Sequence, residues 1–296
     1  MTMPLGAVYD RGYRPYDGPR RERGGSRGAL WRLSVRRALG LRRAWRQKVF
    51  PWTLLGIVTI PAVVNVGIGY VTRKTPVEGF EFITYRDYVG VSTALLLFVA
   101  LTAPDVMCPD RRNRVLPLVF ARPLDGRDYV VAKVGAIAAI VFGFGFAPHV
   151  LLFVGQMLVS PDGALRYLRD HAEVLWQVPI AVAALALYYG SLGVALAATT
   201  GRRVVGGVAI LAALLVTSTV AAILSDATRG NSAWGLLSLL DLPLHVRDLI
   251  FLGSVDPIGP LGGVAGAGPL VLACYVVVVV LCLAFLLRRY RQVPSG

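Results

Sequence analysis

Long apolar windows alternate with short polar connections along the chain. Six windows reach about 20 residues or more, the length that a helix needs to cross roughly 30 Å of hydrocarbon. They cover residues 51–71, 88–107, 129–158, 174–199, 204–224 and 269–287. Their apolar residues are continuous and do not alternate with polar ones, as they would in a transmembrane barrel. The pattern predicts an all-α integral membrane protein with six transmembrane helices.

The third window is longer than a straight crossing requires and contains Pro148. We expect one tilted or kinked helix there, not two separate ones. Between the fifth and sixth windows, residues 231–252 hold two apolar runs that are too short to cross a membrane. Asp241 stands as a possible helix cap before Pro243. These runs predict short external or re-entrant helices that pack against the spans.

A basic amphipathic helix is predicted over residues 29–50, before the first window. Apolar residues gather on one side of this segment and arginines on the other. Such a helix would lie in the cytoplasmic headgroup layer until the chain enters the bilayer at Pro51. The alternative is an exposed helix that ends at Pro51. The residues expected at its edge and polar face are Trp31, Arg32, Arg36, Arg43 and Trp45.

Residues 1–28 are rich in Arg, Gly, Pro and Tyr and show no apolar periodicity. They predict a flexible tail, which is either solvated or docks on another subunit through Tyr9, Tyr13 and Tyr16. The long Arg-rich segment also differs from a secretory signal, so we expect the first span to stay attached. Residues 291–296 are expected to form a short cytoplasmic tail.

Composition agrees with a membrane protein. Hydrophobic residues make up 55% of the 296 residues and charged residues only 16%, and the mean hydropathy is +0.61. A soluble globule of this size could not hide so much apolar surface from water. Arginine dominates the basic residues, which suggests a GC-rich bacterial genome through coding bias.

The basic residues predict the orientation. Thirteen of the 31 Lys and Arg residues lie in the first 50 positions, and six lie in residues 109–133. With six spans, these segments share one side with residues 202–203 and 288–291. The positive-inside rule then predicts that both termini are cytoplasmic. The membrane is expected to be a bacterial inner membrane. The net charge of +14 is explained by this asymmetry and by attraction to anionic membrane lipids, not by nucleic-acid binding.

Ionisable side chains are missing from the middle of the windows, which disfavours ion-coupled carriers and proton relays. The polar residues that could line a path are Asn65, His149, Gln156, Thr217 and Ser218. His149 is explained equally simply as a polar residue that packs against another helix. A membrane-embedded enzyme would require His149, His171 and His245 to meet in space.

Catalytic and metal-binding motifs are also missing from the sequence. There is no HExxH pair, and Cys108, Cys274 and Cys282 do not have metal-ligand spacing. No GxxxxGK[ST] loop that could hold phosphate is present. We therefore expect no catalytic, cofactor or metal site in this chain. If the protein uses ATP, another chain must bind it.

The segment between the second and third windows is strongly charged and then amphipathic. It reads DRRNRVLPLVFARPLDGRDYVVAK from Asp110 to Lys133. This segment, together with the basic entry helix and the order of the spans, resembles the permease subunit of type-2 ABC exporters. In that family the corresponding connection, here residues 108–128, is a coupling helix that docks on an ATP-binding subunit.

The resemblance implies a transport subunit with separate ATPase subunits, which carry ATP and Mg²⁺, and with a second permease copy or a related permease. It assigns the ATPase contact to Asp110, Arg111, Arg112, Arg114, Leu116, Leu118, Phe120, Arg122 and Pro123. Leu116 and Phe120 would be the apolar anchors. Alternatively, these arginines only obey the positive-inside rule and the apolar residues rest on the bilayer. A second alternative is a non-transporting membrane anchor or assembly factor for a soluble partner.

Overall fold

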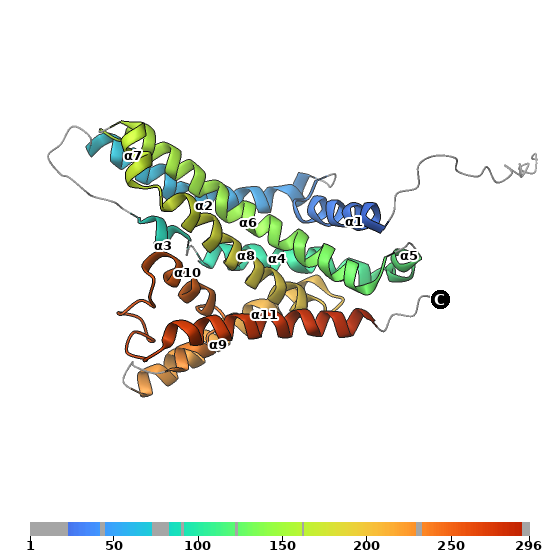
Figure 1. Ribbon diagram of the computed structural model, residues 1–296. Coiled ribbons are helices and arrows are strands. Elements are labelled where there is room, and N and C mark those ends of the chain that lie inside the picture. Colours follow the sequence, from blue (N-terminus) through green and yellow to red (C-terminus); the bar gives the residue numbers. More distant parts are fainter. Residues whose placement is uncertain are drawn as a thin grey trace, which may run out of the picture.

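The computed structural model is an elongated helical bundle (Figure 1). It describes residues 23–41, 45–72, 83–89, 92–121, 124–161, 163–228 and 233–291. These residues form helices and connections without any strand. Six helices are long and apolar enough to cross a membrane, which confirms the all-α fold with six candidate spans.

The candidate spans are α2 (Trp45–Thr72), α4 (Ser92–Arg112), α6 (Gly126–Val159), α8 (Val174–Ala197), α9 (Arg203–Ala227) and α11 (Ala267–Arg291). The short helix α3 (Tyr85–Val89) precedes α4. The remaining elements are α1 (Arg23–Ala38), α5 (Leu116–Phe120), α7 (Ala164–Asp170), the 3₁₀ helix η1 (Ala233–Leu237) and α10 (Leu242–Leu252). α6 runs through Pro148 as one helix.

Small residues bring the central helices α4, α6 and α8 close together. A Cβ atom at Gly190 of α8 would lie 3.2 Å from the backbone nitrogen of Ala138 in α6. At Gly193 it would lie 2.7 Å from the side chain of Val99 in α4. Close approach of this kind is the usual basis of helix packing in membranes, where the hydrophobic effect does not drive association.

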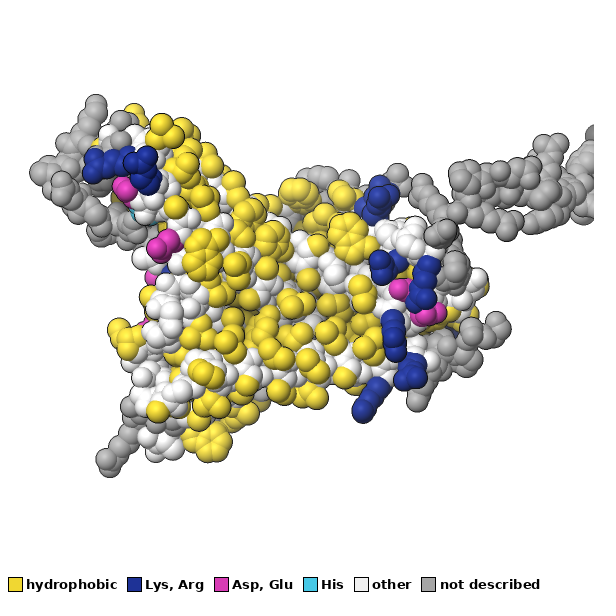
Figure 2. Space-filling model, viewed as in Figure 1, with side chains coloured by type: hydrophobic (Ala, Val, Ile, Leu, Met, Phe, Trp, Pro, Cys, Tyr) yellow, Lys and Arg dark blue, Asp and Glu magenta, His cyan; other side chains and the backbone are white. Residues whose placement is uncertain are grey.

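On the face shown in Figure 2, an apolar belt covers the middle of the bundle, and most of the visible basic side chains lie at one end, with a smaller group at the other. The belt includes exposed side chains of α2, α9 and α11, such as Ile57, Ile223 and Leu281, each at least 60% exposed. So much exposed apolar surface is expected where lipid replaces water. The molecule therefore has the character of a multi-pass membrane protein.

The entry helix differs from its prediction. α1 spans Arg23–Ala38, so residues 23–28 are helical and do not belong to a flexible tail. The helix ends at Ala38, and Gly40 follows it with a φ of 66°, which allows Leu41 N–H to bond Arg36 C=O at 2.8 Å. A second helix, α2, begins at Trp45 and continues through Pro51. Two helices therefore occupy the region where a single helix over 29–50 was predicted, because the left-handed Gly40 follows the end of the first.

The charged connection is also shorter than expected. α4 continues through Arg112 and α6 begins at Gly126, so only residues 113–125 lie between the two helices.

In the connection from α9 to α11, η1 and α10 occupy the region predicted for short helices, and α10 packs against α8 and α11. Residues 1–22 and 292–296 of the two predicted tails lie outside the described residues.

Candidate partner-docking face

One end of the bundle collects the N-terminal helix, the predicted coupling segment and the end of the last helix. α1, α5 and the C-terminal end of α11 lie at this end (Figure 1). We call it the basic end, because Lys and Arg side chains gather there (Figure 2). The shared location agrees with the concentration of Lys and Arg in these segments of the sequence.

A buried charge network joins three helices at the basic end. Asp110, at the end of α4, is only 4% exposed. Its carboxylate lies 2.6 Å from Arg37 of α1 and 2.6 Å from Lys133 of α6, and it accepts a hydrogen bond from the Tyr129 hydroxyl at 3.1 Å. Lys133 also donates to the Val106 carbonyl at 3.1 Å. These contacts fix α1 and α6 to the end of α4.

A second set of ion pairs holds the start of α1 against the start of α6. Arg23 pairs with Asp128 at 2.6 Å and also with Asp125. The same two aspartates form a capping box, in which each side chain bonds the other residue's backbone N–H at the first turn of α6. Arg27 lies 3.9 Å from Asp128. Contact across the fold therefore stabilises a helical turn that contains Gly24 and Gly25, both poor helix formers.

α5 is a single short turn that presents one apolar side chain outward. The chain leaves α4 through Arg114, whose φ is 53°, and Pro117 lies in the first turn of α5. Leu118 is 71% exposed. Leu116 and Phe120 are half-buried against the core, and the Phe120 ring centroid lies 5.9 Å from that of Tyr129. The exposed anchor of this segment is Leu118.

A groove of about 510 Å³ runs between α1 and α5. Its apolar lining comes from both elements and includes Leu30, Leu33, Leu118, Val119 and Leu124. The exposed arginines Arg32 and Arg36 line it from the α1 side. An apolar floor beside fixed positive charge suits a protein surface that offers an apolar side chain and acidic residues.

The predicted ATPase-contact residues differ in their exposure. Asp110 is buried and cannot lie on a docking surface, because burial with its cationic partners is what stabilises it. Arg111 is half-buried and donates to the Ala198 carbonyl at the end of α8. Arg112 and Arg114 are exposed, as is Leu118. Leu116 and Phe120, the predicted apolar anchors, are half-buried and pack against the core. Arg122 and Pro123 lie outside the described residues.

The residues assigned to the entry helix are also divided. Trp31 is 37% exposed and packs over Gly135 of α6, where a Cβ would lie 3.8 Å from its ring. Arg32 and Arg36 are exposed on α1. Trp45 belongs to the first turn of α2, and Arg43 lies outside the described residues.

The residues predicted to line a path fall into separate groups, since Asn65 and Gln156 contact each other while Thr217 and Ser218 lie on α9. Gln156 of α6 donates to the Asn65 carbonyl of α2 at 3.3 Å. Thr217 and Ser218 lie on α9, and Ser218 donates to Asp241 at 3.1 Å, just before α10. Asn65 itself donates to the Ile83 carbonyl at 2.9 Å. The structure therefore does not combine these residues into one channel.

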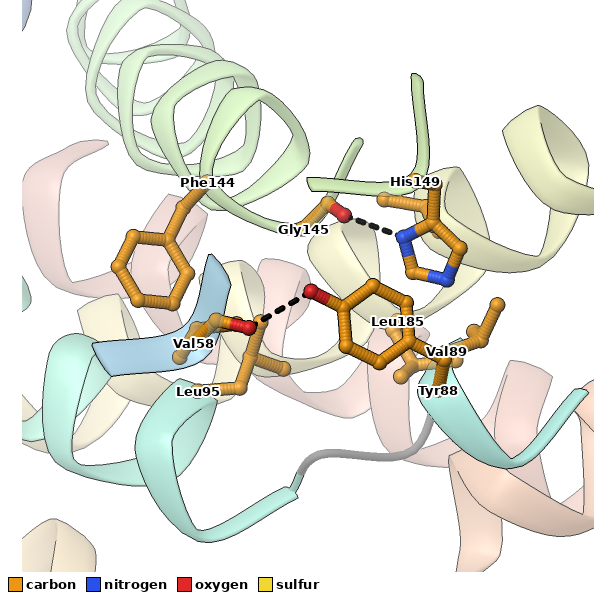
Figure 3. A pocket seen from close by; sticks show the side chains of 9 residues that line it. Val58, Tyr88, Val89, Leu95, Phe144, Gly145, His149 and Leu185 are labelled. Carbon is orange, nitrogen blue, oxygen red and sulfur yellow. Dashed lines mark hydrogen bonds between the residues drawn. The ribbon is translucent and has the colours of Figure 1, made fainter. Parts of the chain in front are cut away.

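His149 lines a small cavity among α2, α3, α4, α6 and α8 (Figure 3). Its Nδ1 lies 2.6 Å from the Gly145 carbonyl, and its ring centroid lies 4.6 Å from that of Tyr88. The Tyr88 hydroxyl donates to the Val58 carbonyl at 2.6 Å. The cavity volume of about 20 Å³ is enough for one water molecule. These contacts support a packing role for His149.

The three histidines do not form a catalytic group. His171 stacks on Tyr167 at the end of α7, and His245 lies on α10, while His149 packs on Tyr88. Among the described residues, no cluster of His, Cys, Asp and Glu could hold a metal ion.

In comparisons with known proteins, no family model and no curated protein matches the chain.

Proposed function

We propose that this chain is the membrane-spanning permease subunit of an ATP-driven ABC transporter. In this proposal a separate nucleotide-binding subunit carries ATP and Mg²⁺ and docks on the groove between α1 and α5. The observation that carries the proposal is Leu118, which is 71% exposed beside a basic groove at the end of a six-helix apolar bundle. An apolar side chain held out in this way is suited to fill a pocket on a partner.

The basic end is the cytoplasmic end in this proposal, following the positive-inside rule. A bacterial inner membrane and export of an unidentified substrate complete the assignment, as the resemblance implies. The exposed apolar faces of α2 and α9 would meet lipid or a second permease copy. Two copies, or this chain with a related permease, would enclose the path.

The internal contacts provide a route from the groove to the membrane helices. α5 connects α4 directly to α6, and the Asp110 network fixes both helices to α1. A partner that closes on ATP would therefore move this end as one body and shift α6 against α8. Differential binding of the partner to two arrangements of the helices is what would drive the change.

Copurification tests the proposal. The tagged chain is isolated in mild detergent with a nucleotide-binding subunit that carries a GxxxxGK[ST] loop. We expect Leu118→Glu to reduce capture of the nucleotide-binding subunit by about tenfold or more, because a charge would be buried in an apolar pocket of that subunit. Leu165→Glu is the matched control, because Leu165 is 84% exposed on α7 at the opposite end. Equal capture by both variants and by the unmodified chain would remove the groove from its assigned role.

A further inference from the structure

A second large cavity lies at the end of the bundle opposite α5. It has a volume of about 430 Å³, which is within the range of small-molecule sites. Its lining comes from α3, α9, η1 and α10 and from the connection that contains Asp256 and Pro260. The elements that surround it lie together at this end (Figure 1). The proposed docking partner would bind the basic end, so this cavity has no part in that contact.

The arginines of the cavity are already paired. Arg86 of α3 lies 2.9 Å from Asp248 and also pairs with Asp256. Arg247 of α10 lies 2.7 Å from the same Asp248 carboxylate. The two guanidinium groups are thus offset by two carboxylates. A ligand that carries negative charge would have to compete with both of them.

Two further carboxylates line the cavity. Asp226 is exposed near the end of α9. Asp241 accepts hydrogen bonds from the hydroxyls of Ser218 and Ser238. Four aspartates therefore face two arginines in the described lining. The excess negative charge favours a cationic ligand.

Two buried polar side chains in the lining have no hydrogen-bond partner among the described residues. His245 is 7% exposed, and neither of its ring nitrogens is bonded. Ser225 is 6% exposed, and its Oγ is likewise unbonded. Buried polar groups in proteins are nearly always satisfied. Two unsatisfied groups on one cavity indicate that a polar ligand completes it.

The imidazole suits a cationic ligand that also has hydroxyl groups. Burial lowers the pKa of His245, so the ring is neutral near pH 7. A neutral imidazole does not repel a cation, and it offers one donor and one acceptor. The Ser225 hydroxyl can also donate and accept. Hydroxyl groups are therefore the natural partners of both side chains.

We propose that this cavity binds a small hydroxylated organic cation. Its ammonium group faces the carboxylates of Asp226 and Asp241, and its hydroxyls bond His245 and Ser225. The inference stands on the cavity alone and does not depend on the proposed function. It also separates this end of the molecule from the basic end, where positive charge surrounds the groove.

Ligand binding to the purified full chain in detergent tests the site. The probes are glucosamine and N-methylglucamine, and their neutral counterparts are glucose and sorbitol. We expect at least one amine to bind about tenfold or more tightly than its neutral counterpart, since hydrogen bonds to charged groups are the stronger ones. Glucuronate, an anionic analogue of glucose, should not bind. If neither amine binds more tightly than its counterpart, the proposal is wrong.

Two variants separate a ligand site from general electrostatic attraction. Asp226→Asn should weaken amine binding about tenfold, while Asp170→Asn on exposed α7, outside the cavity, should leave it unchanged. His245→Leu should also reduce the affinity for the amine, in contrast to the Asp170→Asn control. Ser225→Ala provides a smaller change if His245→Leu does not fold. Unchanged affinity in the Asp226 variant and in whichever of the other two folds would overturn the assignment.

Discussion

Asp110 shows how far a residue's role can differ from its local sequence. It lies in a run of charged residues, so the sequence alone suggests a solvated position. In the structure it is buried against Arg37, 73 residues earlier, and Lys133, 23 residues later. No local pattern reveals partners at such separations. The exposure of Arg112 and Arg114, which have no comparable buried carboxylate beside them in the described fold, agrees with the simple local expectation.

Removing the Asp110 charge should destabilise the fold strongly. Asp110→Asn leaves two cations near each other in a buried site, and breaking a buried pair in this way costs about 3–5 kcal/mol. Asp125→Asn is the control, because its side chain is 63% exposed and an exposed pair contributes at most about 1 kcal/mol. Denaturant unfolding in detergent would measure both variants. Similar losses in the two variants would contradict a buried structural network.

The ion pair of Asp256 gives a second prediction for individual residues. Arg86 holds the pKa of the Asp256 carboxyl below its ordinary value. The pairing is therefore complete above that ordinary value, about 3.9, and is lost as the pH falls through the lowered folded-state pKa. A spin label at Ile258→Cys, a 95% exposed position, should become more mobile only in that acidic range. In an Arg86→Gln background the label should already be mobile at pH 7; equal mobility in both backgrounds would exclude this pairing.

At the scale of elements, helix type and number are predictable, but helix ends and contacts are less so. The apolar windows are long enough that only helices satisfy the backbone in lipid, and this made the six spans clear. The end of α1 has a sequence signal in Gly40, because glycine readily adopts the left-handed conformation that follows a helix. The extension of α1 back to Arg23 has no such sequence signal, because it depends on ion pairs with Asp125 and Asp128 at the start of α6.

The contact between α6 and α11 should depend on Gly126. A Cβ at this position would lie 2.5 Å from the Tyr290 carbonyl oxygen, so Gly126→Ala must move one helix. We expect a destabilisation of about 1–3 kcal/mol, as for other overpacked sites. Gly143→Ala on the same helix is the control, because nothing lies within 4 Å of its added Cβ. Thermal unfolding should separate the two variants, and equal midpoints would show that the close approach is not required.

The whole molecule divides its chemistry between two ends of an apolar bundle. The basic end carries the groove of α1 and α5, and the opposite end carries the cavity of His245 and the aspartates. The sequence predicted the concentration of basic residues at one end because the positive-inside pattern is local to each connection. It did not predict the cavity, because His245, Ser225 and Arg86 come from three elements that only the packed fold brings together.

Crosslinking in intact membranes tests the central claim most directly. A photoreactive phenylalanine analogue replaces Leu118 in the groove or, as the control, Leu165 on α7. Both positions are strongly exposed, at 71% and 84%, so general reactivity is matched. The account predicts that illumination joins position 118, but not position 165, to a subunit that carries a GxxxxGK[ST] loop. Crosslinking to that subunit from position 165 alone, or from neither position, would contradict the account.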